Sequence, residues 1–446
     1  MKEHPNILLI ITDQQSSSMM SCSGNKWLRT PNIDYLAKHG TRFDNAYCTD
    51  PVCIPSRFSL MTGLYPSDLG FIHNDYQCDI SGIPDSILSN GIGRLLSYAG
   101  YDAVYGGKEH LPYFDASDLG FHYITSDERW DLAHTCADYI TNRQQDDRPF
   151  MMVASFINPH DICLMALNDF AAESDNEEDR FFATSMKCEV ATMLDAKRIP
   201  QHINEKIFYE TICPQLPENF LPAKDEPEAV TYLQNKRPFK KLARERYSED
   251  QWRLHRWAYA RLTELVDTQI GIILDALINS NQFDNTIIIF TSDHGDMDSS
   301  HKCEHKTLLY PECCKVPLII KGVSSINAGT VTHDLVSNGL DLIKTIADYA
   351  GLDLPIQLRG HSLKNIVETA DASPVHDHVV VESECGVMAT DGRYQYSYYY
   401  IGKNNHQFYD LSTNPGCMYN QIMDAKYAGR VAFLKQKIEK HIGRSF

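Results

Sequence analysis

The chain has 446 residues, 43% of them hydrophobic and 22% charged, which is typical of a globular protein with one large domain and an appendage, or with two or three domains. No segment has the roughly 18 apolar residues of a membrane span, and a net charge of −18 argues against a nucleic-acid partner. The 13 cysteines are scattered and odd in number, which favours reduced thiols over a disulfide framework. The start, MKEHPNILLIITDQQ, lacks the shape of a signal peptide, so we expect a cytoplasmic protein, or an exported one if a leader has been removed.

In the first 322 residues, apolar runs alternate with helical patterns. The pattern predicts strands over residues 6–11, 101–107, 150–160, 286–296 and 316–322, and helices over residues 30–40, 92–100 and 252–280. Strands that alternate with helices in this way are typical of βαβ units. We therefore expect an α/β fold in which a large, mainly parallel mixed sheet is sandwiched by helices.

Two regions break this alternation. Residues 161–250 are charged and proline-punctuated, and they predict an insertion of helices and loops, because a structureless loop of that length would be improbable. Near the end, HVVVESE, RYQYSYYYIG and QFYDLST predict strands, and AGRVAFLKQKIEKHI predicts a closing helix. We expect a large α/β domain over residues 1–375, and a small C-terminal subdomain with an antiparallel sheet and a helix over residues 376–446.

Polar residues follow four of the predicted strands. A single aspartate in such a place is usually a helix cap or a turn residue, but several at one edge of a sheet mark a ligand site. Carboxylate and amide oxygens with one imidazole suit a divalent cation such as Ca²⁺, Mg²⁺ or Mn²⁺, and nearby cations and histidines suit a tetrahedral oxyanion ester. The candidate cation ligands are Asp13, Gln14, Asp293 and His294, and the candidate anion-binding groups are Arg57, Lys108, His110, His160 and Lys306.

The stretch TDPVCIPSRFSLMTG leaves three interpretations of Cys53: a buried thiol, half of a disulfide with Cys48, or the precursor of a catalytic group. The sequence Cys53-Ile54-Pro55-Ser56-Arg57 resembles the Cys-x-Pro-x-Arg signature of the type I sulfatases, in the alkaline-phosphatase superfamily. PNILLIITDQQ, TPNIDYLAKHGTRFDNAYC, SLMTGLYP and GGKEHL are similar to further family segments, and so are NPH, NTIIIFTSDHGD with LYPECCKVPLII, and QFYDLSTNPG. These segments follow the family order from about residue 5 to 420.

The resemblance implies that a maturation enzyme oxidises Cys53 to formylglycine, whose hydrate is the attacking nucleophile. One divalent metal ion would then be held by Asp13, Asp293, His294 and the modified residue 53, with Gln14 a neutral ligand at best. Arg57 would hold the hydrate, and Lys108 and Lys306 would bind the sulfate. His110 would assist the later elimination of sulfate. His160 would lie near the leaving-group oxygen, and His160 together with Lys306 could supply a proton to that oxygen. Pro55 and Ser56 would have a maturation and turn role.

Two positions depart from the commonest family pattern. Gln14 stands where many members have a second Asp, and His294 where many have Asn, a combination that resembles choline sulfatases and phosphonate monoester hydrolases. We expect Ca²⁺ first, although the lower ligand charge shifts the preference toward Mn²⁺ or Mg²⁺.

The leading hypothesis is a sulfatase that hydrolyses a small anionic sulfate ester of a sugar or other alcohol, with the maturation enzyme as its protein partner and with neither nucleic acid nor membrane bound. The alternatives are a phosphonate monoester or phosphodiester hydrolase, and a non-catalytic anion-binding homologue. Local alternatives also stay open. HKCEHK predicts either a zinc cluster or a loop that carries Lys306, and the run Tyr398 to Tyr400 predicts either a sugar-stacking surface or strand residues. Asn74 and Asp75 are either substrate contacts or part of a turn. Glu109 is either a specificity contact or a surface side chain.

Overall fold

The computed structural model describes residues 4–446 except 72–73, 75–81, 145–146, 325 and 371. Its centre is an eight-stranded sheet with the strand order β4-β3-β5-β1-β6-β7-β2-β8. The strands are β1 (Asn6–Asp13), β2 (Thr41–Tyr47), β3 (Asp102–Gly107), β4 (His122–Thr125), β5 (Phe150–Pro159), β6 (Thr286–Ser292), β7 (Leu318–Lys321) and β8 (Thr330–Ser337). The predicted α/β class and mainly parallel mixed sheet are confirmed.

Strand β1 lies in the middle of the sheet and is completely buried, as its run NILLIITD predicts. It pairs in parallel with β5 on one side (Ile7 opposite Met151) and with β6 on the other (Ile7 opposite Ile287). Strand β7 runs antiparallel to both of its neighbours, β6 and β2. Strands β1, β3, β5 and β6 share one direction, so their carboxyl ends meet at one edge of the sheet.

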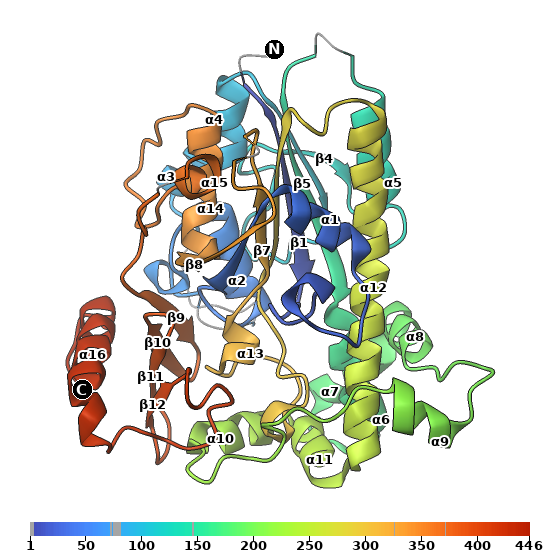
Figure 1. The fold of residues 1–446 in the computed structure, drawn as a ribbon, viewed down its shortest axis with the longest axis vertical. Helices are drawn as coiled ribbons and strands as arrows, with labels where there is room; N and C mark the ends of the chain where they lie inside the picture. The colour runs from blue at the N-terminus through green and yellow to red at the C-terminus, as the bar shows by residue number, and fades with distance from the viewer. Residues whose placement is uncertain (1–3, 72–73, 75–81, 145–146, 325, 371) are drawn as a thin grey trace.

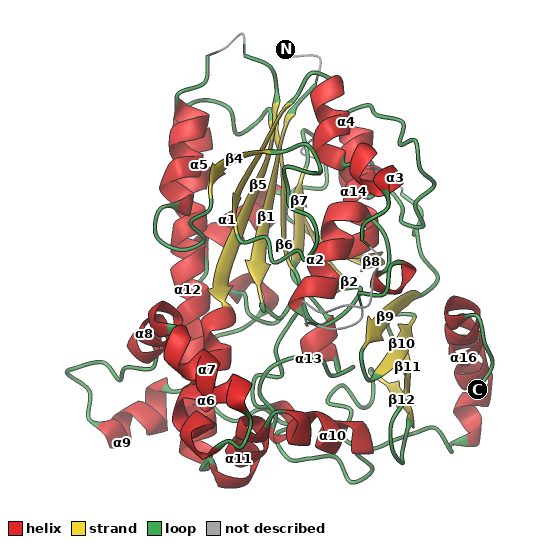
Figure 2. Ribbon diagram, turned by 180° about the vertical axis from the view of Figure 1, so that it is seen from behind, coloured by secondary structure: helices red, strands yellow, loops and turns green. Residues whose placement is uncertain are grey.

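Helices cover both faces of this sheet, and β1 shows how its side chains alternate between the two layers. Ile7, Leu9 and Ile11 join one buried apolar cluster, and Leu8 and Ile10 join the other. Figures 1 and 2 show α2, α4 and α14 on one side and α1, α5 and α12 on the other. Their bounds are α1 (Pro31–His39), α2 (Cys53–Thr62), α4 (Ile92–Tyr98), α5 (Leu132–Thr141), α12 (Glu249–Asn279) and α14 (Asn338–Tyr349), with the short α3 (Asp85–Ser89), α13 (Pro311–Cys314) and α15 (Lys364–Glu368) nearby.

The segment 161–250 folds mostly into short helices with loops between them, as its sequence predicts. They are α6 (Leu164–Phe170), α7 (Glu177–Ser185), α8 (Lys187–Ala196), α9 (Glu205–Ile207), α10 (Glu228–Lys236) and α11 (Pro238–Arg246). Figures 1 and 2 show this group beyond the carboxyl ends of the central strands. The insertion therefore lies at the edge where the candidate site residues gather.

A second, antiparallel sheet with the order β12-β11-β10-β9 follows near the C-terminus. Its strands are β9 (Val379–Ser383), β10 (Gly386–Thr390), β11 (Tyr394–Tyr399) and β12 (His406–Asp410), and the closing helix is α16 (Ala428–Ile442). One face packs against α16 through Val387, Phe408, Leu434 and Ile438. The small sheet and its helix are as predicted, and the division of the chain at residue 375 stays a prediction. None of the helices in the described part of the chain is long and apolar enough to cross a membrane.

Candidate active site

Cys53 is the first residue of α2, and this helix is buried throughout. The expectation that Pro55 and Ser56 form a turn is wrong, because both lie in the first turn of the helix. Proline is tolerated there since the first backbone N–H groups of a helix have no partner within it. The Ser56 hydroxyl donates to the Asp293 carbonyl at 2.5 Å, which ties this turn to the end of β6. The thiol thus stands at the positive end of a helix dipole, beside the strand that carries Asp293.

Four side chains from three elements converge around this thiol: Asp13 at the end of β1, Cys53, and Asp293 and His294 after β6. One possible ligand atom from each lies within 4.8 Å of all the others, and all four residues are buried. The Cys53 Sγ lies 3.6 Å from Asp13 Oδ1 and 3.2 Å from His294 Nε2. The structure therefore brings together four of the five residues predicted to surround a cation.

Arg57 fixes the two carboxylates in place. Its Nη2 lies 3.0 Å from Asp13 Oδ2 and its Nε 2.8 Å from Asp293 Oδ2. Its Nη1 donates to Ser155 Oγ and to the Lys108 carbonyl. Burial and the Asp13 charge raise the pKa of Asp293 to about 6, although His294 and Arg57 oppose this. Two carboxylates so close together repel each other, and a bound cation would relieve this repulsion.

The other donors fit a divalent cation as well. The Nδ1–H of His294 donates to the Gly295 carbonyl at 2.8 Å, so Nε2 is left to face the cluster. Gln14 has a left-handed backbone (φ 67°), and its Nε2 donates to Asp296 Oδ2 at 2.7 Å. Its Oε1 is buried and has no hydrogen-bond partner in the described part of the chain. A buried amide oxygen without a donor is a rare and costly arrangement that a cation would relieve.

Two lysines from different parts of the chain reach the same centre. Lys108, after β3, places Nζ 2.7 Å from Asp13 Oδ2, and Lys306 places Nζ 2.8 Å from Cys53 Sγ. Burial and Asp13 raise the pKa of the Cys53 thiol, but Lys306 and Lys108 outweigh them and hold that pKa well below its usual value. Burial lowers the pKa of Lys306, but Cys53 and Asp13 raise it above the usual range. Both lysines therefore carry charge where an anion would bind.

The two predicted histidines lie at the same centre. His160 follows Pro159, which pairs with Asp13 in the sheet, and its ring nitrogens lie 3.8 and 3.7 Å from Cys163 Sγ. Burial and the Lys108 charge lower the pKa of His160 to about 3, so the ring is neutral and can donate from one nitrogen. Burial lowers the pKa of His110, although the neighbouring Cys53 and Asp13 oppose this. Uncharged histidines beside charged lysines form a cluster that can bind an oxyanion and donate hydrogen bonds to it.

Comparison with known proteins gives this cluster a family. The sequence profile described as "Sulfatase" matches residues 5–352. The chain belongs to the sulfatase family. A second profile, "N-sulphoglucosamine sulphohydrolase, C-terminal", matches residues 299–444. The chain is accordingly a hydrolase of this family.

Relatives extend over nearly all of this sulfatase-family chain. A Delta 4,5-hexuronate-2-O-sulfatase of Bacteroides thetaiotaomicron is 28% identical, over 100% of this chain and 90% of that protein. The solved structure of a 2-O GAG sulfatase has a TM-score of 0.77 and 26% identity, over 99% of this chain and 92% of that one. The phosphonate monoester hydrolase of Agrobacterium radiobacter, with a TM-score of 0.71 over 98% and 95% of the two chains, is 20% identical and shares the fold.

Several residues at the site escaped the sequence analysis. Ser155 holds Arg57, Asp296 holds Gln14, and Arg129 forms a buried ion pair with Asp161 next to His160. Asp296 lies in the quoted segment NTIIIFTSDHGD, so its position in that family motif was an available signal. Ser155 and Arg129 carry no local pattern, because their partners are distant in the sequence.

The local alternatives have different outcomes. Cys48 and Cys53 are both free thiols. Tyr398 and Tyr399 lie in strand β11, as the strand interpretation predicts. Tyr399 is buried in the main core, and Tyr398 stacks on Phe446 with ring centres 3.9 Å apart. Tyr400 follows the strand and is exposed. The HKCEHK segment leads Lys306 to the thiol, as the loop interpretation predicts.

The loop that follows the signature helix is described only in part. Asn74 Oδ1 accepts from the Ile54 backbone N–H at 3.1 Å, and Asp75 lies outside the described residues. Glu109 accepts from the Ala116 backbone N–H and from the Tyr123 hydroxyl. Asn74 and Glu109 therefore have structural partners of their own.

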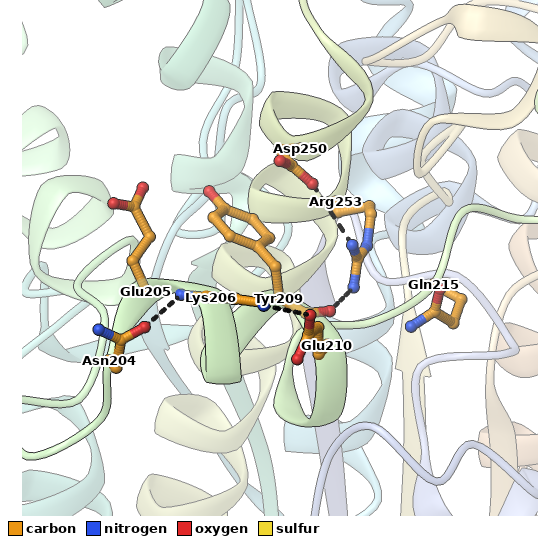
Figure 3. A pocket seen from close by; sticks show the side chains of 8 residues that line it. All are labelled: Asn204, Glu205, Lys206, Tyr209, Glu210, Gln215, Asp250 and Arg253. Atoms are coloured by element: carbon orange, nitrogen blue, oxygen red, sulfur yellow. Dashed lines mark hydrogen bonds and ion pairs between the residues drawn. The ribbon is translucent and has the colours of Figure 1, made fainter.

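A surface cavity of about 710 Å³ lies elsewhere, beside α9 and the first turn of α12 (Figure 3). Its lining residues are Asn204, Glu205, Lys206, Tyr209, Glu210, Gln215, Asp250 and Arg253. None of the predicted site residues lines it. Its charged groups have both signs, and Figure 3 shows Arg253 bonded to Asp250 within it.

Proposed function

We propose that the chain is a sulfatase that hydrolyses the sulfate ester of a sugar, with residue 53 converted to formylglycine and one divalent metal ion beside it. The observation that carries the proposal is the position of the Cys53 side chain. It is buried at 3.6 Å from Asp13 and 3.2 Å from His294, with Lys306 at 2.8 Å. A thiol alone is a poor nucleophile toward sulfur beside a hard cation, whereas the hydrate of an aldehyde at this position would offer oxygen.

The sugar is supported by the relatives, since the names of the hexuronate sulfatase and of the GAG sulfatase both refer to sulfated saccharides. Of the possible ions, Ca²⁺ remains the first expectation, with Mn²⁺ and Mg²⁺ as alternatives. Asp13, Asp293, His294, Gln14 and residue 53 would hold the ion. When bound, it would lower the pKa of the hydrate and stabilise charge on the sulfate oxygens.

The remaining side chains have proposed roles that follow from charge and geometry. Lys108 and Lys306 carry positive charge on two sides of residue 53 and would bind the sulfate oxygens. Arg57 holds both aspartates and would orient the hydrate. His110 and His160, as neutral donors, would serve the two bond-breaking steps: His160 the departure of the alcohol, assisted by Lys306, and His110 the later release of sulfate.

The rival function is a phosphonate monoester or phosphodiester hydrolase on the same scaffold. Gln14 and His294 leave this rival open, because their combination resembles both choline sulfatases and phosphonate monoester hydrolases, whereas the Gly-Lys-x-His-Leu motif with Lys108 and His110 favours sulfate. A non-catalytic anion-binding protein is a weaker alternative, because the described site lacks none of the polar groups that the resemblance implies.

The test combines mass measurement with a substrate screen. Protein co-expressed with a formylglycine-generating enzyme is digested, and the peptide containing residue 53 is weighed. The converted enzyme is then given sulfated monosaccharides, choline sulfate, an aryl sulfate, a phosphodiester and a phosphonate monoester. Hydrolysis of a sulfated sugar with residue 53 as formylglycine supports the proposal. Faster turnover of the phosphorus esters favours the rival, and unconverted Cys53 without turnover favours the non-catalytic alternative.

A further inference from the structure

A buried ion pair lies directly beside His160. Arg129 Nη1 and Nη2 lie 2.5 and 2.7 Å from the two carboxylate oxygens of Asp161, the residue that follows His160 in the chain. Asp161 is fully buried and Arg129 is 8% exposed. Burying two charges is costly, and the geometry must be nearly ideal to offset the loss of water. This bidentate arrangement has that geometry.

Arg129 is itself held from several directions. Its backbone N–H donates to Asp127 Oδ1 at 2.9 Å, and its carbonyl accepts from the Gln269 amide on the central helix α12. Its Nη2 also lies 3.6 Å from Glu189 on α8. The loop before α5, the insertion helix α8 and helix α12 therefore all meet at Arg129, whose guanidinium in turn holds the Asp161 carboxylate in the turn after β5.

The ring that this support carries is at the reacting centre. The turn begins at His160 (η3, His160–Cys163), and the Asp161 N–H bonds back to Asn158 Oδ1 at 3.3 Å. A tilt of this turn would move the imidazole against the Cys53 thiol, while Asp13, Arg57 and Lys108 are held by their own contacts at other strand ends. In the described part of the chain, neither Arg129 nor Asp161 hydrogen-bonds to Asp13, Arg57 or Lys108, so the ion pair bears most directly on His160.

We propose that Arg129, through Asp161, is the positioning residue that aims His160 at the leaving-group oxygen of the substrate. This inference rests on the proposed function. In that reaction the S–O bond to the alcohol breaks while a new S–O bond to the nucleophile forms, and the leaving oxygen takes up a proton. A hydrogen bond from His160 helps most when the alcohol is a poor leaving group, and least when it leaves readily as a stable anion.

The experiment uses Arg129→Lys, which keeps the charge but cannot form the fork. Wild type and variant are compared on a series of substituted phenyl sulfates, from 4-nitrophenyl to 4-methoxyphenyl sulfate, and on an alkyl sulfate. We expect kcat/KM to fall about 10- to 100-fold for the poorest leaving groups, the size of a small misplacement of a catalytic group. The rate with 4-nitrophenyl sulfate should change by less than about threefold, so the dependence on leaving-group pKa becomes steeper.

Three further variants complete the experiment, and the first tests whether the effect passes through His160. In a His160→Ala background, Arg129→Lys should add no further steepening, because effects that act through one group are not additive. Arg143→Lys is the matched control, since Arg143 lies 3.0 Å from Asp102 at the opposite end of β3, and it should leave the leaving-group dependence unchanged. Asp161→Asn gives a second route to the same weakening if the first variant folds poorly.

The outcomes separate this inference from the proposed function. If the wild type hydrolyses neither these sulfates nor any sulfated sugar, the proposed function fails. If it hydrolyses only a sulfated sugar, the positioning role predicts that Arg129→Lys and not Arg143→Lys lowers kcat/KM for that sugar, and equal rates overturn it. If the wild type is active but Arg129→Lys and Asp161→Asn both lower the rates of all substrates equally, or not at all, the positioning role is overturned and the proposed function stands. If Arg129→Lys steepens the leaving-group dependence as much in the His160→Ala background as in the wild type, the positioning role is overturned as well.

Discussion

The carboxyl edge of the large sheet and the cavity beside α9 differ in what they do with charge. At the sheet edge, two buried carboxylates, a buried guanidinium and a buried ammonium group contact one another, and one of the carboxylates and a second buried ammonium group lie against a buried thiol. In the cavity, the ion pairs Lys206–Glu210 and Arg253–Asp250 have one or both members largely exposed. Exposed pairs contribute little, and water screens them. Concentrated buried charge marks the candidate site more clearly than the 710 Å³ of the open cavity does.

The largest effect should come from the centre of the buried cluster. Cys53→Ala removes the precursor of the nucleophile, and sulfate-ester hydrolysis should fall by about 10⁴-fold or more. Initial rates on 4-nitrophenyl sulfate measure this. Cys48→Ala is the control, because Cys48 is a buried thiol of the same region whose Sγ donates to the Cys313 carbonyl. If Cys53→Ala kept its activity, the buried cluster around Cys53 would not be the site of sulfate-ester hydrolysis.

A smaller effect is expected at the edge of the cluster. Gln14→Leu removes the amide oxygen that has no partner, and the affinity for Ca²⁺ or Mn²⁺ should weaken by about 10- to 100-fold, the range seen when a group supporting a metal is lost. Calorimetric titration of the metal-depleted protein gives this directly. Gln15→Leu is the control, because Gln15 Oε1 is also buried without a hydrogen-bond partner in the described part of the chain, but its Nε2 bonds to the Met19 carbonyl and not to Asp296. Equal affinities for wild type and Gln14→Leu would remove Gln14 from the ligand set.

How much of the fold and the candidate site could be predicted depends on how far apart in the sequence the interacting residues lie. The ends of β1, β5 and β6 were predictable, because apolar runs locate buried strands and parallel strands share an edge. Helix α2 was not, since Pro55 reads as a turn residue although the first helical turn accepts it. Strand β2 (TRFDNAY) is too polar for a buried-strand pattern. Arg129 and Asp161 are 32 residues apart, and only the folded chain brings them together.

A third buried acid shows what happens when no cation comes near. Asp50 is fully buried three positions before Cys53, and neither carboxylate oxygen has a hydrogen-bond partner in the described part of the chain. Burial, together with Glu382 and Glu384, raises the pKa of Asp50 well above 3.8. The folded state thus keeps a proton that the unfolded state loses above about pH 4, so this residue lowers stability increasingly as pH rises from there toward the folded-state pKa.

Asp50→Asn removes that linkage. The free energy of unfolding of the variant, relative to wild type, should rise between about pH 4 and neutral pH, by on the order of 1–3 kcal/mol. Thermal unfolding across this range measures it. Asp341→Asn should instead destabilise the protein, because Asp341 is equally buried but accepts from the backbone of Ser337 and His361. Parallel pH profiles for wild type and Asp50→Asn would show that a hidden partner holds this carboxylate.

The smallest effect belongs to the cavity. Tyr209 lies in a turn of π-helix, Phe208–Ile212, and its ring lies among the charged residues that line the cavity (Figure 3). Single π-helical turns are frequent at functional sites, so volume and backbone both favour a role here, while the exposed charges of both signs argue against one. Tyr209→Ala should leave kcat/KM for the preferred sulfated monosaccharide within about twofold of wild type, as surface changes usually do. If the rate fell tenfold or more for a sulfated oligosaccharide but not for the monosaccharide, the cavity would be a remote part of the substrate site, and buried charge would no longer suffice to delimit that site.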